Sequence, residues 1–204
     1  MRILLVGAGG TLGRAVAAEL GPRHEILAAG RNSGEVRIDL TDVESIRRAL
    51  AQAGTLDAVV CAAGSVKFAP LEAFAAAPLA TSLYGTGLED KLMGQVNLAL
   101  EARGHLADRG SITLVSGVLT DSPIAMGSSA SMVNGAIDAF VRAAAIELPR
   151  GLRINAVSPG VLVESMAQYG PFFRGFEPVT AARAALAYSR SVEGLETGKV
   201  YRVG

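Results

Sequence analysis

Short stretches rich in apolar residues recur along the chain and predict the strands of a buried sheet. They lie at Ile3–Val6, Glu25–Ala29, Val36–Leu40, Leu56–Ala63, Ser111–Val115, Leu152–Val157 and Lys199–Val203. Between them, apolar residues repeat at helical spacing. The expected helices fall at Leu12–Leu20, Asp42–Ala53, within Thr86–Asp108, at Gly127–Leu148 and at Arg183–Arg190. This alternation predicts a single three-layer α/β domain over residues 1–204, with a doubly wound parallel sheet.

One predicted connection is unusually short. Only residues 31–35 separate the strand that ends near Gly30 from the strand that begins at Val36. A helical crossover between parallel neighbours usually needs about a dozen residues or more. Either an extended loop returns the chain, or the strand at Val36–Leu40 is stunted. The helix that follows has Thr41 as its expected N-cap.

The first strand runs directly into a glycine-rich turn, in which Gly7, Gly10 and Gly13 follow at three-residue steps. In a dinucleotide site such glycines allow a sharp turn, a close approach of the pyrophosphate, and tight packing of the helix on the strand. Glycine-rich turns also occur as plain strand-to-helix connections, but the start of an α/β repeat favours nucleotide binding. We therefore predict a Rossmann-type phosphate site at Gly7, Gly9, Gly10, Thr11, Leu12 and Gly13, with backbone amides facing the phosphates.

Composition limits the partners of this domain. Hydrophobic residues make up 50% of the chain, and 19 basic residues balance 19 acidic ones. A neutral chain has no net attraction for nucleic acid or for an anionic membrane. Cys61 is the single cysteine, and no apolar stretch is long enough for a signal peptide or a membrane span. We expect a cytoplasmic protein with no nucleic-acid or membrane partner, and no metal, because His24 and His105 lie in no ligand pattern.

Five stretches together resemble the short-chain dehydrogenase/reductase family over essentially the whole chain. They are GAGGTLG at Gly7–Gly13, IDLTD at Ile38–Asp42, VCAAG at Val60–Gly64, SITLVSG at Ser111–Gly117 and RINAVSPG at Arg153–Gly160. They occur in the order and spacing of the family. The glycine spacing is more similar to the extended and atypical branches than to the commonest branch, which would place glycine at Thr11.

The resemblance implies the rest of the cofactor site. Asp39 and Leu40 would meet the adenine, Ala62, Ala63 and Gly64 the adenosine ribose, and Pro159, Gly160 and Val161 the nicotinamide. NAD-preferring members carry an acid at the end of the second strand, where this chain has Gly30. Because no carboxylate repels a phosphate there, and Arg31, Asn32 and Ser33 can donate to one, we predict NADP(H), with NAD(H) as the alternative. Arg31 could also be an ordinary solvated loop residue.

The chain departs from the family in its catalytic residues. The resemblance places Ala130 at the general-acid tyrosine and Asn134 at the lysine that lowers the tyrosine's pKa. Alanine has no proton to donate, and a neutral amide exerts no such electrostatic effect. The family's serine position falls on Gly117, next to Ser116, and its asparagine position falls on Lys91.

Four polar residues are candidates for replacing that chemistry: Ser116, Lys91, Tyr169 and Asn134. Ser116 ends a predicted strand, at the sheet edge where ligands of such folds bind. Lys91 either binds a hydroxyl or carbonyl, or is a solvated lysine. Asn134 could equally be a satisfied core amide. Tyr169 lies where the family keeps its mobile substrate loop, and it is either a replacement acid or a packing residue.

We therefore predict an NADP(H)-dependent oxidoreductase that acts on a small carbonyl or alcohol substrate. The alternative is a protein of the same fold that senses or sequesters NADP(H) without turnover. The missing tyrosine and lysine favour the alternative, whereas the Pro159–Val161 segment favours the enzyme. Small residues on more than one face of the helix at Gly127–Leu148 also predict a homo-oligomer, a dimer or a tetramer.

Overall fold

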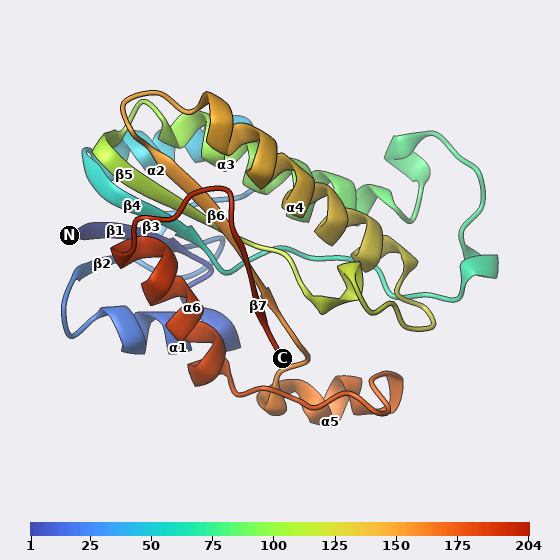
Figure 1. Cartoon of the computed structure of the whole chain (residues 1–204). Helices are drawn as coiled ribbons and strands as arrows, with labels where there is room; N and C mark the ends of the chain where they lie inside the picture. The colour runs from blue at the N-terminus through green and yellow to red at the C-terminus, as the bar shows by residue number, and fades with distance from the viewer.

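Seven parallel strands build one sheet in the order β3-β2-β1-β4-β5-β6-β7 (Figure 1). The computed structural model describes residues 1–204. The strands are β1 Arg2–Val6, β2 Glu25–Gly30, β3 Val36–Arg37, β4 Leu56–Cys61, β5 Leu106–Val115, β6 Arg153–Pro159 and β7 Val200–Val203. The predicted Rossmann-type sheet is confirmed, because every expected strand lies in it and all neighbouring strands pair in parallel.

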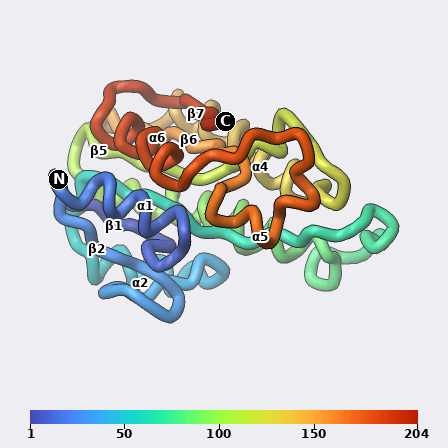
Figure 2. Tube along the Cα trace, turned by 90° about the horizontal axis from the view of Figure 1, so that it is seen from below, coloured from blue at the N-terminus to red at the C-terminus, as the bar shows by residue number.

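Helices cover both faces of the sheet. They are α1 Thr11–Leu20, α2 Val43–Ala53, α3 Gly94–Ala102, α4 Ser128–Glu147, α5 Met166–Tyr169 and α6 Ala181–Glu193. Figure 2 shows α1 and α6 side by side on one face, around a core that includes Leu5 and Leu20. On the other face, α2, α3 and α4 enclose a core that includes Leu4 and Ile137. Successive residues of β1 are therefore buried on opposite faces, which explains its continuous apolar run.

The short connection after β2 leads to a stunted strand. β3 has two residues, yet it pairs in parallel with the end of β2, so the loop 31–35 returns the chain without a helix. The expected N-cap Thr41 is wrong. The Asp42 side chain caps α2 by accepting from the Glu44 amide, whereas Thr41 donates both its amide and its hydroxyl to Asp39.

The region Thr86–Asp108 differs in part from its prediction. A π-helix over Gly87–Met93 precedes α3, which ends at Ala102. β5 then begins at Leu106, ahead of the predicted Ser111. The added residues of β5 include charged ones, and they lie where the register with β4 shifts. No apolar alternation marks this stretch, which is why the sequence pattern missed it.

The carboxyl ends of the strands meet at one edge of the sheet. The chain order reverses between β1 and β4, the kind of switch point at which such sheets bind ligands. Beside this edge, an arm of residues 65–86 projects from the body, and the segment around α5 lies below it (Figure 1). Short 3-10 turns lie at Leu71–Ala73, Leu79–Thr81, Val118–Thr120, Val163–Ser165 and Gly170–Phe172.

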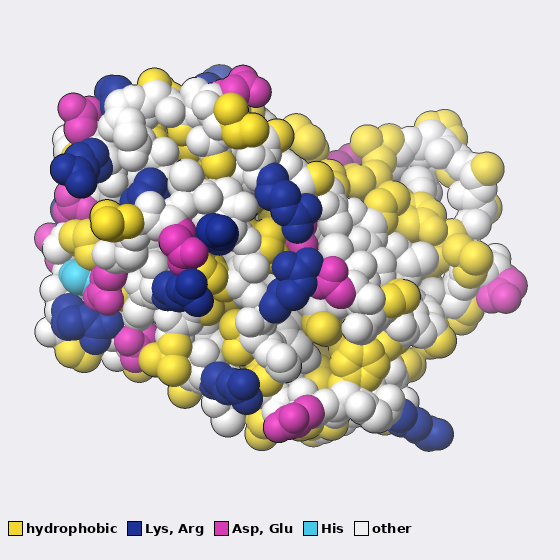
Figure 3. Space-filling model, viewed as in Figure 1, with side chains coloured by type: hydrophobic (Ala, Val, Ile, Leu, Met, Phe, Trp, Pro, Cys, Tyr) yellow, Lys and Arg dark blue, Asp and Glu magenta, His cyan; other side chains and the backbone are white.

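The visible surface divides into two parts. In Figure 3, charged side chains of both signs mix over α6 and β7, whereas the side with the arm and α5 is largely uncharged and hydrophobic. No helix combines the length and the apolar composition that crossing a membrane requires.

Candidate functional site

The turn between β1 and α1, residues 7–13, is closed by backbone contacts, and we call it the glycine cradle. Gly7 has a φ of 84°, and its amide donates to the Ala29 carbonyl at 2.9 Å. A Cβ at Gly7 would lie 2.8 Å from the Ala63 Cβ, and one at Gly13 would collide with the Gly7 carbonyl. A side chain at either position would therefore open the turn.

The start of α1 leaves backbone amides free for an anion. Its N-cap, Gly10, has no side chain that accepts from them, and its first turn contains no acidic residue. The amides of Thr11, Leu12 and Gly13 have no partner within the helix, and the helix dipole favours negative charge at this end. The predicted phosphate residues are thus brought together in a cradle that fits a pyrophosphate.

A hollow beside the cradle lies at the ends of β1, β2 and β4, and we call it the adenosine hollow. Its walls are Val6, Gly7, Gly30, Arg31, Ile38, Leu40, Ala63, Gly64, Ser65 and Asp90. Arg31 is 54% exposed and donates to Asp39 at 3.1 Å, while Asn32 and Ser33 are exposed on the same loop. The Thr41 amide lowers the pKa of the Asp39 carboxyl, and Arg31 adds to this effect. The expected phosphate donors therefore share one loop, although Arg31 already has a carboxylate partner.

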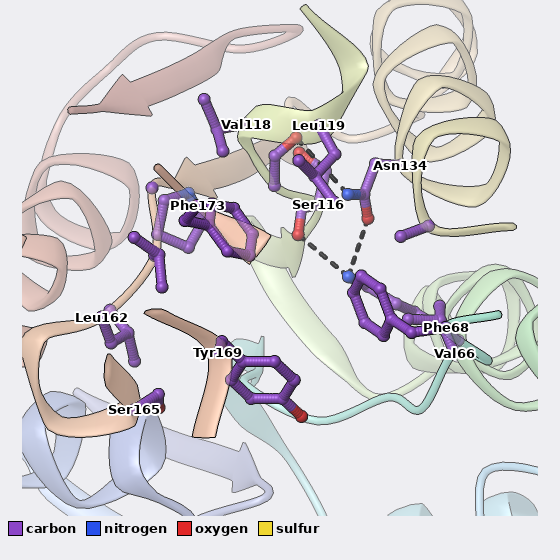
Figure 4. A pocket seen from close by; sticks show the side chains of 16 residues that line it. Val66, Phe68, Ser116, Val118, Leu119, Asn134, Leu162, Ser165, Tyr169 and Phe173 are labelled. Carbon is purple, nitrogen blue, oxygen red and sulfur yellow. Dashed lines mark hydrogen bonds between the residues drawn. The ribbon is translucent and has the colours of Figure 1, made fainter. Parts of the chain in front are cut away.

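A cavity of about 230 Å³ lies at the carboxyl ends of β5 and β6 (Figure 4), and we call it the lysine cavity. Its lining is Val66, Phe68, Lys91, Ser116–Leu119, Ala130, Asn134, Pro159–Leu162, Ser165, Tyr169 and Phe173. These residues come from the arm, the π-helix, the loops after β5 and β6, α4, and the segment around α5. All four predicted catalytic residues and the predicted nicotinamide segment therefore border one space.

Lys91 is the polar centre of the lysine cavity. Its Nζ donates to Asn134 Oδ1 at 2.7 Å and to the Ser116 backbone oxygen at 3.0 Å, as the dashed lines in Figure 4 show. Asn134 in turn donates to the Gly117 carbonyl at 3.4 Å. Burial lowers the pKa of Lys91 to about 8, so this is no ordinary solvated lysine. Because an ammonium has three N–H donors, one remains for a ligand.

A buried glutamine fixes the backbone that carries Lys91. Gln95 Nε2 donates to the carbonyls of Lys91 and Val115, both at 2.9 Å, and the Val115 amide donates to Gln95 Oε1 at 2.8 Å. These bonds tie the π-helix to the end of β5, and π-helical turns are frequent at functional sites. Sequence reasoning missed Gln95. The one feature of the sequence that could have indicated Gln95 is a polar amide side chain among the apolar residues of a helix.

The two predicted hydroxyl groups do not contact the ammonium. Ser116 contributes its backbone oxygen, whereas its hydroxyl is buried without a hydrogen-bond partner. That hydroxyl lies toward Asp138, a buried carboxyl whose pKa is raised by burial. The Tyr169 ring packs on Phe68, with centroids 5.8 Å apart, and its hydroxyl points away from Asn134 in Figure 4. In this arrangement Lys91 is the best placed of the four candidates to donate a hydrogen bond to a ligand in the cavity.

Comparison with known proteins agrees with this architecture. Residues 10–201 match the family model described as Enoyl-(Acyl carrier protein) reductase. The crystal structure of the protein lin1944 from Listeria innocua is 47% identical, with a TM-score of 0.95 and 100% coverage of both chains. The crystal structure of a small-chain dehydrogenase in complex with NADPH has a TM-score of 0.85 at 23% identity, and the match covers 100% of this chain and 96% of that one. The last likeness shows the shared fold.

A curated relative gives a partial match in sequence. An uncharacterized oxidoreductase of Methylorubrum extorquens is 32% identical over 143 residues, which are 68% of this chain. The match spans 56% of the length of that relative. Because the family model covers nearly the whole chain, and the parallel sheet and glycine cradle agree with it, the chain belongs to the short-chain dehydrogenase/reductase family.

Proposed function

We propose that this protein is an NADP(H)-dependent oxidoreductase that transfers hydride between the cofactor and a small carbonyl or alcohol substrate. The position of the lysine cavity supports this best. The cavity is bordered by Pro159–Val161 and opens at the same sheet edge as the glycine cradle. A mostly apolar cavity with a few converging polar groups is typical of small-molecule sites.

Lys91 is the residue that we assign to the substrate oxygen. Its third N–H is free to donate to a carbonyl, and its charge stabilises the negative charge that develops on that oxygen during reduction. Asn134 and the Ser116 carbonyl hold the ammonium in place. A bound nicotinamide supplies or accepts the hydride. Lys91 transfers the proton, since its pKa of about 8 suits acid catalysis near neutral pH, and Tyr169 or water restores it.

The proposed preference for NADP(H) rests on the end of β2. Gly30 presents no carboxylate, and Arg31, Asn32 and Ser33 are exposed donors on the loop that follows. A guanidinium has five N–H donors, so Arg31 can keep Asp39 and still bind a 2′-phosphate. With NAD(H), the alternative cofactor, Arg31 would retain only its carboxylate partners Asp39 and Asp90.

We also propose that the protein is a homo-oligomer, a dimer or a tetramer, and that it works in the cytoplasm. The outer surfaces of α3 and α4 are partly apolar, with Leu100 41% and Ile146 86% exposed. Phe140, Ala143 and Ala144 line a hollow between these helices, and a second copy would cover it. A monomeric mass by sedimentation at micromolar concentration would contradict the assembly.

Hydride transfer by the purified protein tests the function. We expect NADPH to be consumed with at least one member of a panel of small ketones and aldehydes. NADPH binding without consumption by any of them would instead support the sensor alternative. Absence of binding to NADPH and NADH would contradict both functions.

A further inference from the structure

The lysine cavity carries a single charge. None of its lining residues is acidic, and Lys91 is the one basic residue among them. Both acceptors that hold its ammonium, Asn134 and the Ser116 carbonyl, are neutral. Lys91 is half-buried, and burial lowers its pKa. An ammonium that is partly removed from water and contacts no counter-ion is costly, so an anionic ligand would be favoured at this position.

Neighbouring groups offset the charge of the Lys91 ammonium only in part. On β4, burial raises the pKa of the Cys61 thiol to about 12, so the thiol is neutral. On α4, the charge of Asp138 raises the pKa of Lys91, but burial lowers that pKa by more, and Asp138 neither contacts the ammonium nor lines the cavity. Asp90, next to Lys91 in the π-helix, lies 3.8 Å from Arg31 and lines the adenosine hollow instead. The ammonium is therefore available to an anion that enters the cavity.

We infer that the substrate of the lysine cavity is an apolar 2-oxo acid, whose carboxylate serves as the counter-ion of Lys91. This inference rests on the proposed function and names its substrate class. In a 2-oxo acid, the keto oxygen and one carboxylate oxygen lie side by side when the groups are coplanar. The single free N–H of Lys91 can then be shared between these two oxygens as a three-centre hydrogen bond.

The remaining walls suit the hydrocarbon part of such an acid. Val66, Phe68, Leu119, Val161 and Phe173 come from different segments and give the cavity an apolar interior. A branched aliphatic side chain would bury its methyl groups there, which is favourable because apolar surface leaves water. One positive charge within apolar walls matches one carboxylate on an apolar chain.

Reduction of a 2-oxo acid by NADPH and one proton gives a 2-hydroxy acid and NADP⁺. Hydride adds to the keto carbon, and the π electrons of the C=O bond move to the keto oxygen. Lys91 donates a proton to that oxygen, and the neutral amine then recovers a proton from water. The carboxylate stays ionised throughout and serves only to bind and orient the substrate.

Proton uptake on binding tests the inference. A carboxylate beside Lys91 raises the pKa of the ammonium above about 8. At pH 8, binding should therefore take up as much as about half a proton, and at pH 6, where Lys91 is already protonated, almost none. Calorimetry in two buffers of different ionisation enthalpy measures this uptake. The ligand titrated is 4-methyl-2-oxopentanoate. It is added to protein saturated with NADP⁺, which has no hydride to transfer, and in a second experiment to the protein alone.

Matched ligands and variants isolate the charge. We expect the acid to bind at least about tenfold more tightly than its methyl ester, and Lys91→Met to remove this preference together with the proton uptake. Lys91→Arg should keep the preference without the uptake, because arginine stays protonated. Lys67→Met removes an exposed lysine that lies between Val66 and Phe68 in the sequence, and it should change neither quantity. Circular dichroism confirms that each variant is folded.

Equal affinity for acid and ester in the parent protein would overturn the inference. The same proton uptake in Lys91→Met would also overturn it. If neutral ketones are reduced while the acid shows no preference, the proposed function stands and the substrate class is wrong. If the acid binds with the expected uptake but is not reduced by NADPH, the anion site is supported and the proposed function fails.

Discussion

The glycine cradle and the lysine cavity lie at the same edge of the sheet, yet they are built by different means. The cradle consists of backbone: Gly7 and Gly13 leave no room for side chains, and the amides at the start of α1 carry the positive potential. The lysine cavity depends on side chains, with Lys91 held by Asn134. A site built from backbone amides loses its ligand when an added side chain blocks it. A site built from side chains can be formed by other residues, provided that they place the same charge at the same position.

We propose that the lysine cavity is such a rebuilt site. The resemblance places the family's asparagine at Lys91 and the family's lysine at Asn134, and in this chain the two side chains are 2.7 Å apart. In that alignment, an ammonium and an amide would stand in exchanged positions. We propose that this exchange preserves a positive charge beside the substrate, delivered from the π-helix instead of from α4.

The substitution Gly13→Ala should give the largest effect. Because its Cβ would collide with the Gly7 carbonyl, we expect the affinity for NADPH to fall more than about 100-fold and the free energy of unfolding to fall by about 3 kcal/mol. Calorimetry and urea unfolding measure the two quantities. In the control Gly10→Ala, the new Cβ would lie 3.4 Å from the same oxygen, an ordinary contact, so the fold should be nearly as stable as in the parent protein. If Gly13→Ala leaves the affinity for NADPH unchanged, the glycine cradle is not the site that binds the pyrophosphate.

Reversal of the lysine–asparagine exchange should give the next largest effect. Lys91→Asn leaves two amides and no charge, while Asn134→Lys brings two ammonium groups together. We expect each single variant to lose about 100-fold in kcat/KM, with NADPH affinity within a few-fold of the parent. The double variant should recover most of this loss, because one ammonium and one amide are present again. A double-mutant cycle measures the coupling, and a double variant no better than either single would disprove the exchange.

The cradle was predictable from the sequence because its determinants are local. Gly7, Gly10 and Gly13 follow a strand within a few residues, so their spacing alone marks the turn. The contact between Lys91 and Asn134 joins residues 43 positions apart and depends on a π-helix, which no apolar periodicity predicts. Only the resemblance led to these two residues.

The wrong N-cap prediction for α2 has a local cause, because two adjacent residues both suit that position. Thr41 and Asp42 are both favourable N-cap residues, so the sequence could not separate them. Asp39 decided the outcome, because it accepts from the Thr41 amide and hydroxyl and leaves Asp42 to cap α2. Gln95 was missed for a related reason: its three hydrogen-bond partners are backbone groups of two separate elements, and their identity appears only in the fold.

Cofactor selectivity should give the smallest effect, since it depends on one exposed side chain beside the backbone cradle. We expect Arg31→Ala to reduce the preference for NADPH over NADH about tenfold and to leave NADH affinity nearly unchanged. Calorimetry with both nucleotides measures the change. Asp39→Asn is the matched variant: it removes the carboxylate that competes for the guanidinium, so the preference for NADPH should rise. If the parent protein binds both nucleotides equally, Arg31 pairs only with Asp39 and Asp90, and this loop does not select the cofactor. If the preference for NADPH over NADH persists in Arg31→Ala, Asn32 and Ser33 bind the 2′-phosphate, and the Arg31 side chain is not needed for cofactor selectivity.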